Sequence, residues 1–212
     1  LLGPTAMYCF FHSIRLLDLG EAVLLSYSFP LFLPLISTIF LKERASLISW
    51  AAVAIGFLGI VVIEKPTSGL IDPNAAFGIA AAVFAAGAMV SIRYMAPGEP
   101  SPRIVFYYSL LSAIISLFPA MYSWQSPSLQ TLLALMLSGA FATGGQLLLS
   151  SGYSIASPGK IGAFSYFVVP FGVLFGWFFW QETPSPATLA GFVLVIAAGV
   201  LSSQTKPDQK RN

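Results

Sequence analysis

Eight apolar blocks without Asp, Glu, Lys or Arg run through this chain of 212 residues and constrain its fold more than any other feature. Seven of them are close to or above the roughly 17 to 25 residues with which an α-helix crosses a hydrocarbon core about 30 Å thick. The blocks span residues 1–14, 22–41, 45–63, 75–92, 104–122, 129–156, 161–180 and 187–203.

These blocks predict an all-α polytopic membrane protein. Charged residues form 8% of the chain, against about 25% in an ordinary soluble domain, so the surface that they could cover is small. Helices suit a lipid solvent because each satisfies its backbone hydrogen bonds within its own segment. The expected fold is a bundle of eight transmembrane helices.

The positive residues divide unequally between the two sides of such a bundle. If the eight blocks alternate in direction, the loops of one side carry only Arg15 and Lys65. The loops of the other side carry Lys42, Arg44, Arg93, Arg103, Lys160, Lys206, Lys210 and Arg211. The positive-inside rule places the side with more positive residues, which includes the C-terminus, in the cytoplasm. We expect the protein to lie in a bacterial inner membrane with this orientation.

The chain also contains an internal repeat with a shift of 139 residues. The identical pairs that the shift aligns include Gly20 with Gly159, Ser26 with Ser165, Tyr27 with Tyr166, Phe40 with Phe179, Glu43 with Glu182, Ser46 with Ser185 and Val61 with Val200. It maps the first three blocks onto the last three, so the unit is five helices long. Since five is odd, the two copies should face opposite ways across the membrane, as in many secondary transporters.

Two pairs of sequence runs carry a family resemblance. They are SYSFPLFLPLISTIFLKE with GFLGIVVIEKP in the first copy, and SYFVVPFGVLFGWFFWQE with GFVLVIAAGV in the second. The chain resembles EamA-type carriers of the drug/metabolite transporter superfamily, which implies a ten-helix (5+5) inverted-repeat fold. By this resemblance residues 1–66 are the last three helices of the first repeat, 74–205 are the five-helix second repeat, and 206–212 are a cytoplasmic tail. The first two helices of the family fold are expected upstream, and the segment from Pro170 to Glu182 is one residue shorter than that from Pro30 to Glu43.

Prolines inside two matching spans indicate where a substrate could bind. Pro30 and Pro34 should kink the block 22–41, and Pro170 the block 161–180, because proline has no N–H to donate. Interrupted helices at corresponding places of two repeats mark the binding site of many carriers. Pro30 should free the carbonyl of Ser26, and Pro170 that of Tyr166, so we expect substrate contacts at Ser26, Tyr27, Ser165 and Tyr166. Helix bending alone is the alternative.

Other polar and aromatic residues extend this candidate site. The single histidine, His12, lies within a span and suits a proton relay or a substrate contact, or it lies in interfacial water. Gln146 and Ser150 lie one turn apart and need partners, from a substrate or from a neighbouring helix. Tyr8 is either a wall or a contact, and six deeper aromatic residues could wall a cavity: Phe10, Phe11, Tyr107, Tyr108, Phe164 and Phe167.

Loop chemistry and small residues complete the expectations. Glu43 and Glu182 are better suited to a gate or turn than to ion coupling, and each precedes by three residues a serine that can cap the next helix. Small residues at four-residue spacing allow close helix packing, and a homodimer is compatible with them: Ala52 with Gly56, Gly78 with Ala82 and Ala86, and Ala187 with Gly191.

Composition excludes several other functions. One His and one Cys cannot assemble the usual zinc site, every Asp and Glu lies at a span end, in a loop or in the tail, and no phosphate-binding glycine loop is present. We therefore expect no enzyme, no cofactor, no metal and no nucleic-acid partner. The expected function is secondary transport of a small organic metabolite, such as an amino-acid or nucleoside derivative, by alternating access. A channel or facilitator and an inactive truncated protein remain alternatives, and proton coupling, uniport and exchange are all compatible with the sequence.

Overall fold

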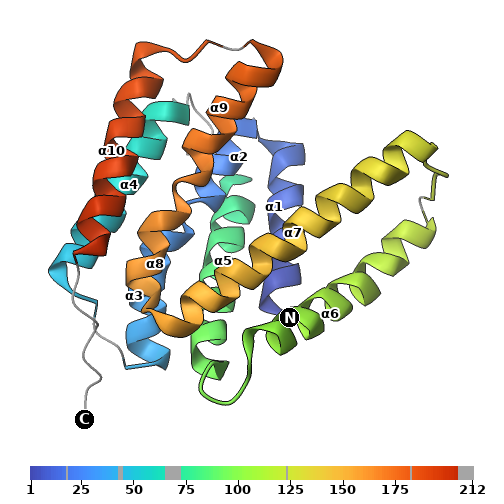
Figure 1. Cartoon of the computed structure of the whole chain (residues 1–212), viewed down its shortest axis with the longest axis horizontal. Helices are drawn as coiled ribbons and strands as arrows, with labels where there is room; N and C mark the ends of the chain where they lie inside the picture. Colours follow the sequence, from blue (N-terminus) through green and yellow to red (C-terminus); the bar gives the residue numbers. More distant parts are fainter. Residues whose placement is uncertain (18, 43–44, 65–72, 123, 182, 205–212) are drawn as a thin grey trace.

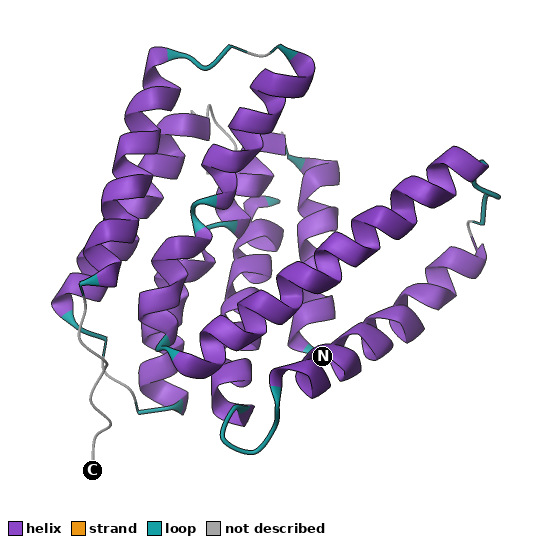
Figure 2. Ribbon diagram, in the orientation of Figure 1, coloured by secondary structure: helices purple, strands orange, loops and turns teal. Residues whose placement is uncertain are grey.

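The computed structural model describes residues 1–17, 19–42, 45–64, 73–122, 124–181 and 183–204, and all regular secondary structure in them is helical (Figure 2). Ten helices follow one another in these residues: α1 (Leu2–Leu16), α2 (Leu19–Ser26), α3 (Phe29–Phe40), α4 (Leu47–Glu64), α5 (Ala75–Met95), α6 (Ser101–Tyr122), α7 (Leu129–Ile155), α8 (Pro158–Ser165), α9 (Val168–Trp180) and α10 (Pro186–Ser203).

The helices follow the eight apolar blocks, with one difference. The blocks 22–41 and 161–180, the two spans expected to be interrupted near proline, each contain two helices, α2 with α3 and α8 with α9. Counting each broken pair as one stretch, the described chain has five stretches long and apolar enough to cross a membrane, and two shorter apolar helices, Leu47–Ile63 and Pro186–Ser202. The chain is therefore a helical membrane protein, while the count of eight spans stays a prediction.

Each broken pair is interrupted just before its proline. Pro30 lies in the first two positions of α3, and Pro170 is the third residue of α9. At these positions a missing N–H costs little because the first turn of a helix has no internal acceptor for it. The Tyr166 carbonyl, expected to be free, accepts a hydrogen bond from the Val169 N–H at 3.1 Å. This bond spans three residues and gives the Tyr166 carbonyl a partner. Of the three prolines, only Pro34 lies in the interior of a helix, α3.

Two left-handed residues lie 139 positions apart. Lys42 follows α3 with φ 55°, Gln181 follows α9 with φ 60°, and they are the only described residues other than glycine with positive φ. A side chain in this conformation normally costs free energy, so its occurrence at both sites is a local backbone feature that the two copies of the repeat share.

The helices after these turns begin with matching caps. The Ser46 Oγ accepts a hydrogen bond from the Ser49 N–H at 3.1 Å, and the Ser185 Oγ accepts one from the Thr188 N–H at 3.2 Å. The two predicted serine caps are thereby confirmed, and Pro186 occupies the first helical position after Ser185.

The helix pair α4 and α10 forms the most extensive helix contact in the protein, and the two lie side by side in Figure 1. Glycine makes the close approach possible. A Cβ atom on Gly59 would lie 2.9 Å from the Gly191 carbonyl oxygen, and one on Gly191 would lie 2.7 Å from the Gly59 oxygen. The two backbones therefore touch where neither residue has a side chain.

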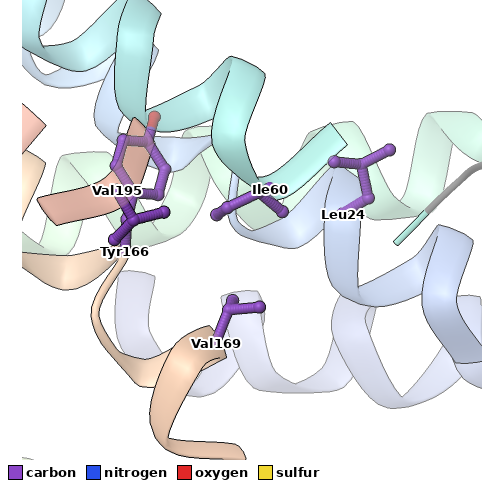
Figure 3. Close-up of a cluster of buried hydrophobic side chains, with 5 residues drawn as sticks. All are labelled: Leu24, Ile60, Tyr166, Val169 and Val195. Atoms are coloured by element: carbon purple, nitrogen blue, oxygen red, sulfur yellow. The ribbon is translucent and has the colours of Figure 1, made fainter. Parts of the chain in front are cut away.

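Two clusters of buried side chains hold several helices of the bundle together. The first joins Leu24, Ile60, Tyr166, Val169 and Val195 from α2, α4, α9, α10 and the turn between α8 and α9 (Figure 3). The second joins Leu33, Ala86, Val90 and Tyr153 from α3, α5 and α7. In Figure 1, α6 and the first part of α7 form a hairpin that leans away from these helices, and its side chains are mostly apolar and exposed, as expected of a surface in contact with lipid.

Candidate functional site

A cavity of about 650 Å³ lies between α1, the junction of α2 and α3, α5, α6 and α7. This volume lies within the range of roughly 300 to 1,000 Å³ typical of small-molecule sites. Most of the lining is apolar. A limited number of polar side chains in such a wall is the arrangement that orients an organic ligand.

The apolar wall comes from α1, α5 and α6. Helix α1 contributes one stripe at helical spacing, formed by Leu2, Ala6, Met7 and Phe10 together with Gly3 and Pro4. The Tyr108 hydroxyl donates a hydrogen bond to the Met7 sulfur at 3.8 Å and so joins α6 to α1. Of the six deeper aromatic residues expected to wall a cavity, Phe10, Tyr107 and Tyr108 line it, whereas Phe11, Phe164 and Phe167 do not.

Four of the eight predicted substrate contacts line this cavity. Ser26 ends α2, Tyr27 lies in the break that follows, and Gln146 and Ser150 lie one turn apart on α7. The hydroxyl groups of Ser26 and Ser150 are buried and have no hydrogen-bond partner among the described residues. Because an unpaired buried hydroxyl costs roughly 1 to 3 kcal/mol, each is available to a bound molecule or to water.

A charged pair adds to the lining where α5 and α6 are connected. The Arg103 guanidinium donates a hydrogen bond to a Glu99 carboxylate oxygen at 2.9 Å, and the side chains remain 58% and 42% exposed. Both residues line the cavity. A ligand in the cavity next to these residues therefore meets one positive and one negative group.

Tyr8 and His12 lie on a different face of α1. Their rings stack on each other with centroids 6.1 Å apart, and the His12 ring meets the Phe77 ring edge-on at 4.5 Å. Neither residue lines the cavity. The structure therefore separates these two predicted contacts from Ser26, Tyr27, Gln146 and Ser150.

Ser165 and Tyr166 also lie outside the cavity lining, although they repeat Ser26 and Tyr27. The Tyr166 side chain is completely buried and packs beside Val195 and Ile60 (Figure 3). Its ring covers Gly56, where a Cβ atom would overlap it. The two copies of the Ser-Tyr pair thus have different surroundings in this structure.

The remaining predicted residues either are buried in helices without lining the cavity or lie outside the residues that the structure describes. Pro30 and Pro34 are buried in α3, and Pro170 is buried in α9. Glu43 and Glu182, the expected gate residues, lie outside the described residues. In the described part of the chain no three His, Cys, Asp or Glu side chains lie close enough together to hold a metal ion.

Most of the lining residues were not expected from the sequence, among them Met7, Glu99 and Arg103. Met7 repeats Gln146 at a distance of 139 residues, and both line the same cavity, so the repeat could have identified Met7. Glu99 and Arg103 are ordinary charges near a span end, and only the packing of α6 against α1 brings them to the cavity.

Comparison with known proteins agrees with this architecture. A pseudopaline exporter of Pseudomonas aeruginosa is 32% identical over 208 residues, covering 97% of this chain and 73% of the exporter. An S-adenosylmethionine uptake transporter of Rickettsia bellii is 24% identical over 202 residues, covering 94% of this chain and 69% of that protein. A solved crystal structure has a TM-score of 0.82 at 21% identity, over 93% of this chain and 71% of that one, which shows a shared fold.

The sequence profile of the EamA-like transporter family matches residues 1–64 and 73–204. These residues contain all ten of the helices described above. The resemblance seen in the sequence is therefore confirmed, and the chain is an integral membrane protein that belongs to the EamA-like transporter family.

Proposed function

We propose that this protein is a secondary transporter that moves a small polar or zwitterionic metabolite, of the amino-acid-derived class, by alternating access. The cavity of about 650 Å³ carries the proposal, because it combines apolar walls with four hydroxyl or amide groups contributed by both repeats. Binding between two repeats, next to interrupted helices, is characteristic of such carriers.

The charged pair supports a zwitterionic substrate. Arg103 can pair with a carboxylate and Glu99 with an ammonium group, and the two charges lie together on the cavity lining. Exposed ion pairs contribute little to stability, so exchanging this internal pair for a pair with the ligand costs little free energy. Relatives are named as an exporter of pseudopaline and an uptake transporter of S-adenosylmethionine, and these names support a small metabolite as the substrate.

The orientation of the chain determines which compartment this cavity faces. In Figure 1 the C-terminal ends of α3, α5, α7 and α10 lie at one end of the bundle. The cavity lining includes Glu99 and Arg103, which lie where α5 is followed by α6. Of the described positive residues, Lys42, Arg93, Arg103 and Lys160 lie near these helix ends in sequence, and the positive-inside rule assigns such an end to the cytoplasm. We infer an inward-facing state in a bacterial inner membrane.

Uptake into liposomes, together with ligand-induced thermal shifts, tests the proposal. A panel of amino acids, amino-acid-derived zwitterions and nucleosides is assayed on the purified chain and on Gln146→Ala, with His12→Ala as a matched variant outside the cavity. We expect one class of compound to raise the melting temperature of the purified chain and of His12→Ala. For Gln146→Ala, the affinity derived from the same titration should be at least tenfold lower. Equal binding and uptake by Gln146→Ala would show that the cavity is not the substrate site.

A channel or facilitator is the second candidate, and kinetics distinguish it. A carrier that alternates between two states shows saturation and is accelerated by substrate on the opposite side, whereas a pore shows neither property. Non-saturating flux would favour the channel.

A further inference from the structure

Two tyrosine hydroxyl groups in the described part of the chain are buried without a hydrogen-bond partner, and both belong to residues outside the cavity lining. Tyr153 and Tyr166 are both completely buried, and neither hydroxyl group forms a hydrogen bond with a described residue. Neither residue lines the cavity. Buried polar groups in proteins are almost always paired, so two unpaired phenol groups in one region require an explanation.

The two tyrosines belong to one local cluster. Ser165, which precedes Tyr166, lies close enough to the Tyr153 hydroxyl for the two groups to interact. The phenol groups of Tyr153 and Tyr166 are near enough for an electrostatic interaction. The cluster is thus formed by α7 and by the junction of α8 and α9.

The cluster is also continuous with the cavity. Tyr153 follows Ser150 by three residues on α7, so the two side chains lie on neighbouring parts of one helix face. Ser150 lines the cavity, and its own hydroxyl has no partner. A row of unpaired hydroxyl groups therefore leads from the cavity to the break between α8 and α9.

The two Ser-Tyr pairs of the repeat have different surroundings, and this difference relates the cluster to transport. Ser165 and Tyr166 repeat Ser26 and Tyr27, and each pair is placed where a spanning helix is interrupted. One pair lines the open cavity; in the other, Tyr166 is completely buried and Ser165 is half-buried outside the cavity lining. In a carrier built from inverted repeats, movement of one repeat against the other exchanges the open side for the closed one.

We propose that Tyr153, Ser165 and Tyr166 form a second polar subsite, closed in this structure, which opens to the opposite side of the membrane when the α8–α9 junction moves. The subsite donates hydrogen bonds from its two phenol groups to a carboxylate or carbonyl oxygen of the substrate. This inference rests on the proposed transport function and extends it to a state that the present conformation does not display.

Paired cysteine variants test the opening of the subsite without any transport assay. Ser26→Cys and Ser165→Cys are made separately in a Cys9→Ser background, so that each protein has one thiol. A small membrane-impermeant thiol reagent is applied to either face of sealed vesicles. We expect Ser26→Cys to react from one face and Ser165→Cys, at least tenfold more slowly, from the other. No reaction at Ser165→Cys, or reaction from the same face as Ser26→Cys, would overturn the proposal.

Phenylalanine variants test the role of the phenol groups. Tyr153→Phe and Tyr166→Phe remove an unpaired hydroxyl and keep the ring, so a purely structural role predicts an unchanged or higher melting temperature and unchanged transport. The subsite predicts the same melting temperature with at least a tenfold loss of uptake. Tyr122→Phe, whose ring is exposed at the end of α6, is the matched control and should transport normally.

Each outcome has one interpretation. Unchanged uptake in both variants would show that the tyrosines only fill space, and a large fall in melting temperature would show that their hydroxyl groups serve a structural water network. If the unmodified chain transports nothing, the proposed function fails, but the opposite reactivity of the two cysteines still decides whether the subsite opens.

Discussion

Substitution of Gly191 by alanine gives a quantitative test of the helix packing on which this bundle depends. A methyl group at Gly191 would lie 2.7 Å from the Gly59 carbonyl oxygen and 3.2 Å from Ile63 Cδ1. A relaxed carbon–oxygen contact is about 3.3 Å or longer. Helices α4 and α10 must therefore separate by roughly 0.6 Å, because a backbone carbonyl cannot rotate away.

The magnitude follows from the contacts that this movement weakens. A gap of about 0.5 to 1 Å removes roughly a quarter to a half of each dispersion interaction across an interface. Overpacking of this kind typically costs about 1 to 3 kcal/mol. Alanine also gains up to about 1 kcal/mol over glycine from its helix propensity, which offsets part of the loss.

A second glycine separates the two contributions. Gly139 lies within α7, and a Cβ atom there would have no neighbour within 4 Å. Gly139→Ala receives the same helix-propensity gain without the clash, so the difference between the two variants measures overpacking alone. It should be about 1 to 3 kcal/mol, or roughly 2 to 12 °C in melting temperature for a chain of this size.

Thermal unfolding of the detergent-purified variants, followed by thiol-reactive or intrinsic fluorescence, measures this difference. Gly191→Ala should unfold at the lower temperature. If it is as stable as Gly139→Ala, α4 and α10 are not in backbone contact at this glycine pair, and the packing argument is refuted.

Three further predictions use other parts of the molecule. Arg103→Gln should weaken substrate binding about tenfold in a thermal-shift titration while its stability changes by less than about 1 kcal/mol, because the pair with Glu99 is exposed; a stability loss of several kcal/mol would contradict this. Ser185→Ala should destabilise the protein by about 1 kcal/mol because the Thr188 N–H loses its cap, and the melting temperature reports it. Gln146→Leu should fold normally and lose substrate-induced stabilisation, and retained ligand binding would remove Gln146 from the site.

The sequence predicted those features that depend on local chemistry. Long uncharged blocks indicated the helices, Pro30 and Pro170 marked the two interrupted spans, and Ser46 and Ser185 capped the helices as expected. Each of these follows from the properties of a few adjacent residues, such as a missing N–H or a short side chain with an acceptor.

The sequence could not predict how a helix is rotated about its axis. Met7 and Tyr8 are adjacent, yet Met7 lines the cavity and Tyr8 stacks on His12 on another face of α1. One residue turns the helix by about 100°, so membership of the site depends on which neighbouring helix packs on which face. That choice is made by tertiary contacts, such as the Tyr108 hydrogen bond to Met7.

Sequence identity also could not show which repeat copy is open. Tyr27 and Tyr166 are each preceded by serine, but a buried position for the Tyr166 ring requires the space above Gly56. At the position that repeats Gly56, the chain has Val195, which packs in the same cluster as Tyr166. The two copies therefore prefer different packing, and this difference can bias a carrier toward one of its two states.

Labelling at two turns with the same backbone provides the most direct test of the inverted repeat. Lys42 and Gln181 follow matching broken helices, both have left-handed backbone conformations, and both side chains are exposed. Lys42→Cys and Gln181→Cys, each in the Cys9→Ser background, should both fold because neither side chain packs in the interior.

An odd number of spans per repeat requires these two cysteines to lie on opposite sides of the membrane. A membrane-impermeant maleimide applied to intact cells should therefore label Gln181→Cys, and should label Lys42→Cys only after the membrane is opened. The two sites share the same local backbone, so a difference in labelling reports their compartment rather than their reactivity. Labelling of both from the same side would mean that the repeats are parallel, and the alternation between an open and a closed Ser-Tyr pair would then lose its structural basis.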